Sequence, residues 1–341
     1  MAKLAAQRLR QRGVDVKAFS DANVSRWGTV IDGIPLIPPE EIVSKYPAAA
    51  VLIATSLYDS EISEELGKLG CSLIYSMPYL NYCLPDVFVS REYHHLFDAA
   101  ANRDNHGTMR QVWDLIIDDE SRKVFQSKLL YMLTLDKAYL NAIRTSHPIY
   151  LDPAIMPLSQ TEVFADGGAF TGDTLRDFLH VTGGAFQGYY AFEPDERNLE
   201  RLHAIARTDP ARIHVIQAGL AEQSGTLFFT PTGSYDSKFT TFGSVASIPL
   251  PVVSLDDYFQ RREPPTFIKL DVEGSEFAAL RGGCNIIKQH CPRIATSVYH
   301  CPQDLWELPS LLHSLNGKYR FIFRHCTREI DDTVCYALLP G

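Results

Sequence analysis

The fold is decided by a glycine-rich turn, Phe164-Ala165-Asp166-Gly167-Gly168-Ala169-Phe170-Thr171-Gly172-Asp173-Thr174. A strand expected over Val163–Ala165 leads into this turn, and a helix expected over Asp173–Leu179 follows it. Small residues in such a turn let a ligand approach the backbone closely. In an open parallel sheet, ligands bind outside the carboxyl ends of the strands, where this turn lies. The sequence therefore predicts a ligand site here.

Two acidic residues indicate what the turn binds. Asp166 opens the turn, and Glu193 ends the next expected strand, Tyr189–Phe192. A carboxylate at position 166 would repel a pyrophosphate and attract the amino and sulfonium groups of S-adenosylmethionine. An acidic residue about 20 positions beyond the glycines accepts hydrogen bonds from ribose hydroxyls; in the alternative, Glu193 only caps the helix that opens at Pro194. We therefore favour S-adenosylmethionine over NAD.

The alternation of strands and helices continues through residues 151–341. Further strands are expected over Ile213–Gln217, Thr266–Leu270 and Ile294–Val298, and helices over Glu196–Ala206, Ser275–Gly282 and Leu305–Leu315. A hairpin-like pair, Gly225–Thr230 and Ile248–Val253, interrupts the alternation, and a second pair, Arg320–Arg324 and Val334–Leu338, closes it. Alternation of this kind predicts a doubly wound α/β domain with a mostly parallel sheet.

Two other parts are expected before this domain. Residues 1–78 alternate short helices and strands, which predicts a smaller Rossmann-like α/β domain that begins inside its first helix. Because it lacks an opening strand and a glycine-rich turn, we expect it to serve docking or assembly rather than cofactor binding. Residues 79–150 have helical apolar spacing without strands, which predicts a helical connector. This connector offers a face for a homo-oligomer.

Composition narrows the partners and the location. The formal net charge of −9 argues against binding to nucleic acid or to an anionic membrane surface. No apolar run reaches the roughly 18 residues of a spanning helix, and the N-terminal stretch has no apolar core typical of a signal peptide. The seven scattered cysteines favour reduced thiols in a cytoplasmic protein.

Charged residues alternate with apolar ones in Ile268-Lys269-Leu270-Asp271-Val272-Glu273-Gly274-Ser275-Glu276. Strand geometry sends Lys269, Asp271 and Glu273 to one side, at the sheet edge that also holds the glycine-rich turn. We expect Asp271 to orient the acceptor, to bind a cation or to lower the barrier electrostatically. The alternative is a Lys269–Asp271 ion pair without chemistry.

Three motifs together resemble the FkbM family of methyltransferases: Asp166-Gly167-Gly168-Ala169, Phe192-Glu193-Pro194 and Lys269-Leu270-Asp271-Val272-Glu273-Gly274. The resemblance implies a class I, Rossmann-like methyltransferase fold and O-methylation of a sugar, polysaccharide or natural-product acceptor. The residues expected to hold S-adenosyl-L-methionine are Asp166, Gly167, Gly168, Ala169, Gly172, Thr174, Glu193, Pro194 and Ala218.

Methyl transfer to a hydroxyl benefits from a base, and histidine titrates near neutral pH. His300 and His325 each follow an expected strand, so His300 is the first candidate for the base or for orienting the acceptor, and His325 is the second. Asp271 and Lys269 complete the expected catalytic set. Three His-Cys pairs lack the close spacing of structural zinc sites, so no metal ligand is expected. A Mg²⁺-like ion held by Asp271 and Glu273 is the less favoured alternative.

The polar and aromatic stretch over residues 232–243 is either a lid over the site or an ordinary hairpin loop. As a lid it would bring Tyr235 and Phe239 against a sugar or aromatic acceptor. Two other functions stay open: a nucleotide-binding oxidoreductase, and a non-catalytic binding protein that keeps the methyltransferase fold. Asp166 argues against the first, and the presence of Asp166, Glu193 and Asp271 together argues against the second.

Overall fold

The computed structural model describes residues 2–340 except 56–57, 85, 89–93, 147, 231–237, 241–247 and 329. The chain divides into two compact units. The smaller unit is Met1–Ala101 with Leu130–Lys137, and the larger unit is Asn102–Leu129 with Ala138–Gly341. The division expected from the sequence, 1–78, 79–150 and 151–341, stays a prediction. The helices expected in the connector are shared between the two units.

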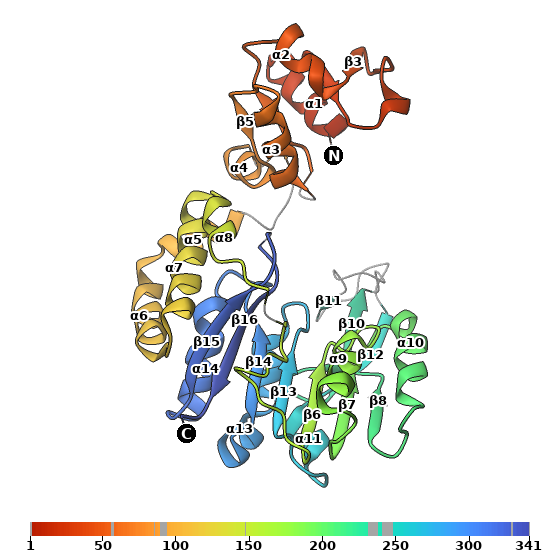
Figure 1. The fold of residues 1–341 in the computed structure, drawn as a ribbon, viewed down its shortest axis with the longest axis vertical. Helices are drawn as coiled ribbons and strands as arrows, with labels where there is room; N and C mark the ends of the chain where they lie inside the picture. The colour runs from red at the N-terminus through yellow and green to blue at the C-terminus, as the bar shows by residue number, and fades with distance from the viewer. Residues whose placement is uncertain are drawn as a thin grey trace. The chain divides into compact units, whose positions relative to one another are not determined.

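A seven-stranded sheet runs through the larger unit in the order β15-β16-β14-β13-β6-β7-β8 (Figure 1). Its strands are β6 (Val163–Gly167), β7 (Gly188–Phe192), β8 (Ile213–Ile216), β13 (Phe267–Leu270), β14 (Arg293–Ser297), β15 (Arg320–His325) and β16 (Thr333–Leu338). Neighbouring strands are parallel except at β16, which is antiparallel to both β14 and β15. The doubly wound α/β fold and its closing strand pair are therefore confirmed.

The central strands are buried along their whole length, as expected when helices cover both faces of a parallel sheet. Every residue of β6 and β13 is buried. The helices of this unit are η3 (Arg103–Asn105), α6 (His106–Leu115), the first part of α7 (Asp119–Thr134), α8 (Ala138–Asn141), α9 (Asp173–Thr182), α10 (Glu196–Ala206), α11 (Leu255–Phe259), α12 (Glu276–Arg281), α13 (Cys284–His290) and α14 (Asp304–Leu315). Helix α14 packs against β16 and against α6, α12 and α13, and α10 packs against β8.

An aromatic cluster fills the core between β6 and α9. The Phe164 ring stacks on Tyr189 with centroids 5.0 Å apart and meets Phe267 at 4.6 Å and Phe178 at 5.0 Å. Such pairs add about 0.5–1.5 kcal/mol each beyond the area that they bury. The cluster fixes the strand that leads into the glycine-rich turn.

A second sheet of the larger unit has the order β11-β10-β12-β9. It consists of β9 (Gly219–Leu220), β10 (Gly225–Thr230), β11 (Lys238–Thr240) and β12 (Ile248–Val253). The expected hairpin-like pair is confirmed, because β10 and β12 are antiparallel neighbours. The sequence did not predict β11, α11 or α13. Tyr235 and most of the expected lid lie outside the described residues.

The smaller unit alternates short strands and helices, as expected. Its elements are α1 (Ala2–Gln11), β1 (Phe19–Ser20), η1 (Val24–Arg26), β2 (Val30–Ile31), β3 (Ile34–Ile37), η2 (Pro39–Glu41), α2 (Ile42–Lys45), β4 (Val51–Leu52), α3 (Asp59–Lys68), β5 (Ile74–Tyr75), α4 (Met77–Cys83) and α5 (His94–Ala101). The strands form two separate sheets, β1-β3-β2 and β4-β5, instead of one continuous Rossmann sheet. In the described part of the chain, each helix is too short or too polar to cross a bilayer.

Candidate functional site

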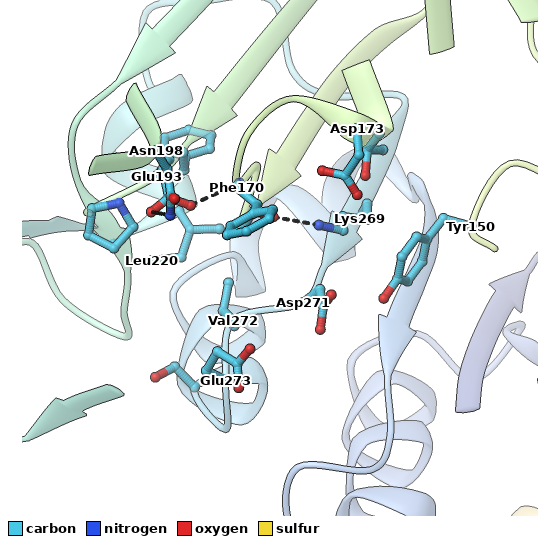
Figure 2. Close-up of a pocket in the computed structure, with 16 residues that line it drawn as sticks. Tyr150, Phe170, Asp173, Glu193, Asn198, Leu220, Lys269, Asp271, Val272 and Glu273 are labelled. Atoms are coloured by element: carbon cyan, nitrogen blue, oxygen red, sulfur yellow. Dashed lines mark hydrogen bonds between the residues drawn. The ribbon is translucent and has the colours of Figure 1, made fainter. Parts of the chain in front are cut away.

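A cavity opens at the carboxyl ends of the central strands (Figure 2). The space inside it is about 790 Å³ when the part open to solvent is counted. Six residues expected in the site line it: Gly168, Thr174, Glu193, Pro194, Lys269 and Asp271. The other expected residues, Asp166, Gly167, Ala169, Gly172, Ala218, His300 and His325, are not among its lining residues.

The glycine-rich turn is fastened to the neighbouring strand and loop. The amides of Gly168 and Ala169 both donate to the carbonyl of Phe192, at 3.0 and 3.1 Å. Gly168 has φ +75°, and a Cβ there would lie 1.8 Å from the Asp271 carbonyl oxygen. Only glycine fits such a left-handed position so close to another backbone. The turn after β6 and the loop after β13 therefore touch through their main chains.

Asp166 lies beneath the turn and not in the cavity. Its side chain is fully buried, and Lys269, which is 2% exposed, places Nζ 3.1 Å from Oδ1. The Tyr189 hydroxyl donates to the same carboxylate. Burial raises the pKa of Asp166, although Lys269 and Tyr189 oppose this. This burial speaks against the expectation that the carboxylate faces the ligand, because the positive charge of Lys269 balances it inside the protein.

Lys269 also holds the turn itself. Its Nζ donates to the carbonyl oxygens of Gly167 at 3.2 Å and Gly168 at 2.8 Å. Burial lowers the pKa of Lys269, but the carboxylates of Asp166 and Asp271 outweigh this and raise it, so the ammonium is retained. The carboxylate within ion-pair distance of Lys269 is Asp166, not Asp271 as the alternative supposed. Lys269 thus connects strand β13 to the turn.

Glu193 lines the cavity at the end of β7. Its Oε2 accepts from the Phe170 amide at 2.9 Å, and its Oε1 accepts from the Asp195 amide at 2.8 Å and from Asn198 Nδ2 at 3.2 Å. Burial raises the pKa of Glu193, opposed by these hydrogen bonds. Asp195, rather than Glu193, is the N-cap of α10, because its side chain accepts from the Arg197 amide. The carboxylate is thus held in a fixed position at the cavity wall.

Asp271 lies across the cavity from Glu193, close to Tyr150 (Figure 2). Its Oδ1 accepts from Ser297 Oγ at 2.8 Å and from the Tyr299 hydroxyl at 3.1 Å, and the Tyr150 hydroxyl lies 2.9 Å from Ser297 Oγ. Burial acts to raise the pKa of Asp271, but Lys269, His300 and the hydroxyls outweigh it and lower the pKa. The Asp271 side chain is 27% exposed, so an ionised carboxylate faces the cavity.

His300 lies beside Asp271, as the strand order suggested. Its Nδ1 is 2.9 Å from Glu276 Oε1, and its Nε2 is 3.4 Å from Glu273 Oε2 and 3.6 Å from Asp271 Oδ1. Burial acts to lower the pKa of His300, but the three carboxylates outweigh this effect and raise the pKa to about 10. At neutral pH the ring already carries two protons, which speaks against His300 as the base.

His325 lies away from the cavity. It is fully buried, with Nδ1 2.9 Å from the Thr333 hydroxyl. Burial and the nearby Lys128 lower its pKa to about 3. The structure therefore speaks against the second candidate as well. It also brings Tyr150 and Asn198 into the site, which sequence reasoning missed because they lie outside the recognised motifs. Phe170 lines the site too; it belongs to the glycine-rich turn, but the sequence assigned it no role.

Comparisons with known proteins agree with this architecture. Residues 166–329 match the family described as Methyltransferase FkbM domain. The crystal structure of Methyltransferase FkbM from Methylobacillus flagellatus KT superposes with a TM-score of 0.75 at 24% identity, over 95% of this chain and 84% of that one. Fibrillarin from Aeropyrum pernix, solved with S-adenosyl-L-methionine, gives a TM-score of 0.34 at 12% identity, over 54% of this chain and 69% of that one.

A curated relative adds a shorter match. The hexuronic acid methyltransferase AglP from Haloferax volcanii is 27% identical over 101 residues, which are 29% of this chain and 42% of that protein. The matched part thus covers less than half of that relative. Residues 166–329 of this chain thus match the methyltransferase FkbM domain family, and the larger unit has a class I, Rossmann-like fold.

Proposed function

We propose that this protein is an S-adenosyl-L-methionine-dependent O-methyltransferase whose acceptor is a small molecule or a glycan. The observation that carries the proposal is the placement of Glu193 and Asp271 at opposite sides of one cavity within the FkbM domain. The hexuronic acid methyltransferase among its relatives favours a sugar hydroxyl as acceptor. A cytoplasmic location and a homo-oligomer stay predictions.

The charge of the cavity supports a cationic donor. Four carboxylates line it, those of Asp173, Glu193, Asp271 and Glu273. The lining residues include one cation, Lys269, which is paired with Asp166. A diphosphate would be repelled by this lining, whereas a sulfonium and an amino group would be attracted. The cavity therefore carries the negative charge that was expected from Asp166, but other carboxylates supply it.

The donor side of the site is formed by Glu193 and the turn. Glu193 has the position to accept hydrogen bonds from ribose hydroxyls, and Gly168, Thr174 and Pro194 are the wall beside it. Asp166, Gly167, Ala169 and Gly172 act from behind, by fixing the turn. Ala218 lies next to Gly219, which lines the cavity. Bound S-adenosyl-L-methionine supplies an activated methyl group.

The acceptor side is formed by Asp271. Its carboxylate accepts a hydrogen bond from the acceptor hydroxyl and directs the oxygen towards the donor. Ser297 and Tyr299 hold the carboxylate in place. In-line displacement depends above all on alignment and close approach of the two reacting groups. A shift of Asp271 is therefore expected to lower the rate more than the donor affinity.

Titration calorimetry with S-adenosylhomocysteine tests the donor side. We expect binding by the wild type, about tenfold weaker binding by Glu193→Gln through loss of charge-assisted hydrogen bonds, and no change in Glu200→Gln, an exposed position on α10. A parallel titration with NAD tests the oxidoreductase alternative. Binding of NAD without S-adenosylhomocysteine would overturn the proposal.

Methyl transfer is tested by release of S-adenosylhomocysteine in the presence of hexuronic acids and other sugars. We expect release with at least one acceptor, and a rate about 100-fold lower in Asp271→Asn with unchanged S-adenosylhomocysteine affinity. Donor binding without release on any acceptor would favour the non-catalytic binding protein instead.

A further inference from the structure

Tyr150 lines the cavity from the segment that precedes β6, outside the residues that match the family. Its backbone φ is +66°, a left-handed conformation that is uncommon for a bulky side chain. Its amide donates to the Tyr336 hydroxyl on β16 at 3.2 Å, which helps to hold this conformation. Residues with such backbone conformations gather at functional sites, where the surrounding structure maintains them. The position and the conformation together indicate that the Tyr150 side chain has a task in the cavity.

The hydroxyl hydrogens around Asp271 can be assigned by counting donors. Ser297 Oγ and the Tyr299 hydroxyl both donate to Asp271 Oδ1, at 2.8 and 3.1 Å. A serine hydroxyl has one hydrogen, and Ser297 gives it to the carboxylate, which can only accept when it is ionised. The Tyr150 hydroxyl lies 2.9 Å from Ser297 Oγ and must therefore be the donor in that contact. The hydrogen bonds thus run in one direction, from Tyr150 to Ser297 and from Ser297 to Asp271.

Burial strengthens this chain of hydrogen bonds. Ser297 is 0% exposed and Tyr150 is 7% exposed, so little water competes for their hydroxyls. Burial and the charge of Asp271 hold the pKa of the Tyr150 hydroxyl well above its usual value, so this hydroxyl keeps its hydrogen. The centroid of the Tyr150 ring lies 5.2 Å from Lys269 Nζ, within the range of a cation–π contact. Tyr150 therefore contacts both the lysine that holds the glycine-rich turn and the serine that holds Asp271 (Figure 2).

We infer that Tyr150 is a positioning residue, which fixes the orientation of the Asp271 carboxylate through Ser297 and so aligns the acceptor hydroxyl with the donor. The inference rests on the proposed function, in which Asp271 binds the acceptor. The terminal torsion of an aspartate side chain has broad minima, so hydrogen bonds decide how its carboxylate is turned. Small misplacements of a reacting group lower the rate strongly. Loss of the Tyr150 hydroxyl therefore lowers kcat and leaves the donor side of the cavity intact.

A double-mutant cycle on the full chain tests whether Tyr150 acts through Ser297. With glucuronic acid as the acceptor, we expect Tyr150→Phe to lower kcat about tenfold, the effect of one hydrogen bond, with an unchanged KM for S-adenosyl-L-methionine. Ser297→Ala is expected to lower kcat by at least as much. Because the two hydroxyls act in series, adding Tyr150→Phe to Ser297→Ala is expected to cause less than about a twofold further loss.

Tyr319→Phe is the matched control for the loss of a buried tyrosine hydroxyl. Tyr319 is 0% exposed, and its hydroxyl donates to the Pro292 carbonyl at 2.6 Å. It is not among the residues that line the cavity. This variant therefore loses a hydrogen bond of the same kind, and we expect it to keep the wild-type kcat.

Carbon NMR of the full chain, labelled with ¹³C at its aspartate side-chain carboxyls, tests the same contacts without donor or acceptor. The signal of Asp271 is identified by its absence in Asp271→Asn. At neutral pH we expect this signal to shift in Tyr150→Phe and in Ser297→Ala, because the carboxylate loses hydrogen bonding that orients it. We expect the signal to stay in place in Tyr319→Phe.

Three results would overturn the inference: an unshifted Asp271 signal in Tyr150→Phe, kcat losses that multiply fully in the double variant, or a kcat loss in Tyr319→Phe as large as that in Tyr150→Phe. Should Tyr150→Phe fail to fold, Ser297→Ala decides, because it removes the oxygen that joins Tyr150 to Asp271. An unshifted signal there counts equally against the inference. A wild type that methylates no sugar, while the NMR signal shifts as expected, contradicts the proposed function and not the hydrogen-bond chain.

Discussion

Replacing Lys269 with methionine is expected to destabilise the larger unit by about 3–5 kcal/mol, because Asp166 loses the cation that balances it inside the protein. The two groups are 3.1 Å apart, with exposures of 2% and 0%. At an effective dielectric constant of about 20, their attraction is about 5 kcal/mol. Lys269→Met also removes the hydrogen bonds to the Gly167 and Gly168 carbonyls, which adds about 1 kcal/mol each.

The double variant Asp166→Asn/Lys269→Met separates the ion pair from these hydrogen bonds. Because both charges are then absent, we expect it to be more stable than Lys269→Met alone by about 2–3 kcal/mol. Arg281→Met is the matched control. It breaks an exposed pair with Glu222, with exposures of 49% and 46%, and is expected to change stability by less than about 1 kcal/mol.

Urea denaturation followed by tryptophan fluorescence measures these differences, since Trp306 is buried in α14 of the larger unit. The reasoning would be refuted by a Lys269→Met variant within about 1 kcal/mol of the wild type. It would also fail if the effects of the two single substitutions simply added in the double variant.

Three further predictions concern the same unit. Burial lowers the pKa of Lys128 from 10.5 to about 7. Between pH 7 and 10.5 the unfolded chain therefore holds more protons than the folded one, and the free energy of unfolding rises with pH. In urea denaturation at pH 7 and pH 9, Lys128→Met is expected to reduce this rise by about 2 kcal/mol. The pKa of His325 is lowered from 6.5 to about 3. Below pH 6.5 the unfolded chain therefore binds a proton that the folded chain does not, and the free energy of unfolding falls on acidification. His325→Gln is expected to make this fall shallower, and an unchanged dependence of stability on pH would contradict the prediction. Gly168→Ala is expected to weaken S-adenosylhomocysteine binding by about tenfold or more, since its Cβ meets the Asp271 carbonyl, whereas Gly184→Ala, with φ +78° and nothing within 4 Å, keeps the wild-type affinity in calorimetry.

Much of the central sheet could be predicted because its central strands are largely buried and rich in apolar residues. The turn and the residues that end β7 and β13 were located for the same reason, since motif residues follow directly on such strands. Short elements such as β11 and α13 could not be predicted, because their periodicity is too brief to stand out. The two-residue strands of the smaller unit are too short to predict for the same reason.

The interaction partners of the charged residues were harder to predict from the sequence than the strands. Whether Asp166 faces a ligand or an ion-pair partner depends on Lys269, 103 positions later in the chain, and on how deeply the pair is buried. The protonation of His300 depends on three carboxylates, two from the loop after β13 and one from the first residue of α12. Tyr150 reaches the site only because the chain passes there before β6. Side-chain depth and pairing of this kind follow from tertiary packing and leave no local pattern.

The contact between Gly168 and the Asp271 carbonyl has a consequence for engineering. Where two main chains meet with no room for a methyl group, neither segment can be exchanged alone without moving its neighbour. A chimera that takes the proposed acceptor side from a similar methyltransferase must therefore import residues 166–172 together with 271–274. If the proposed roles hold, the segment that binds the donor and the segment that binds the acceptor must change together in evolution.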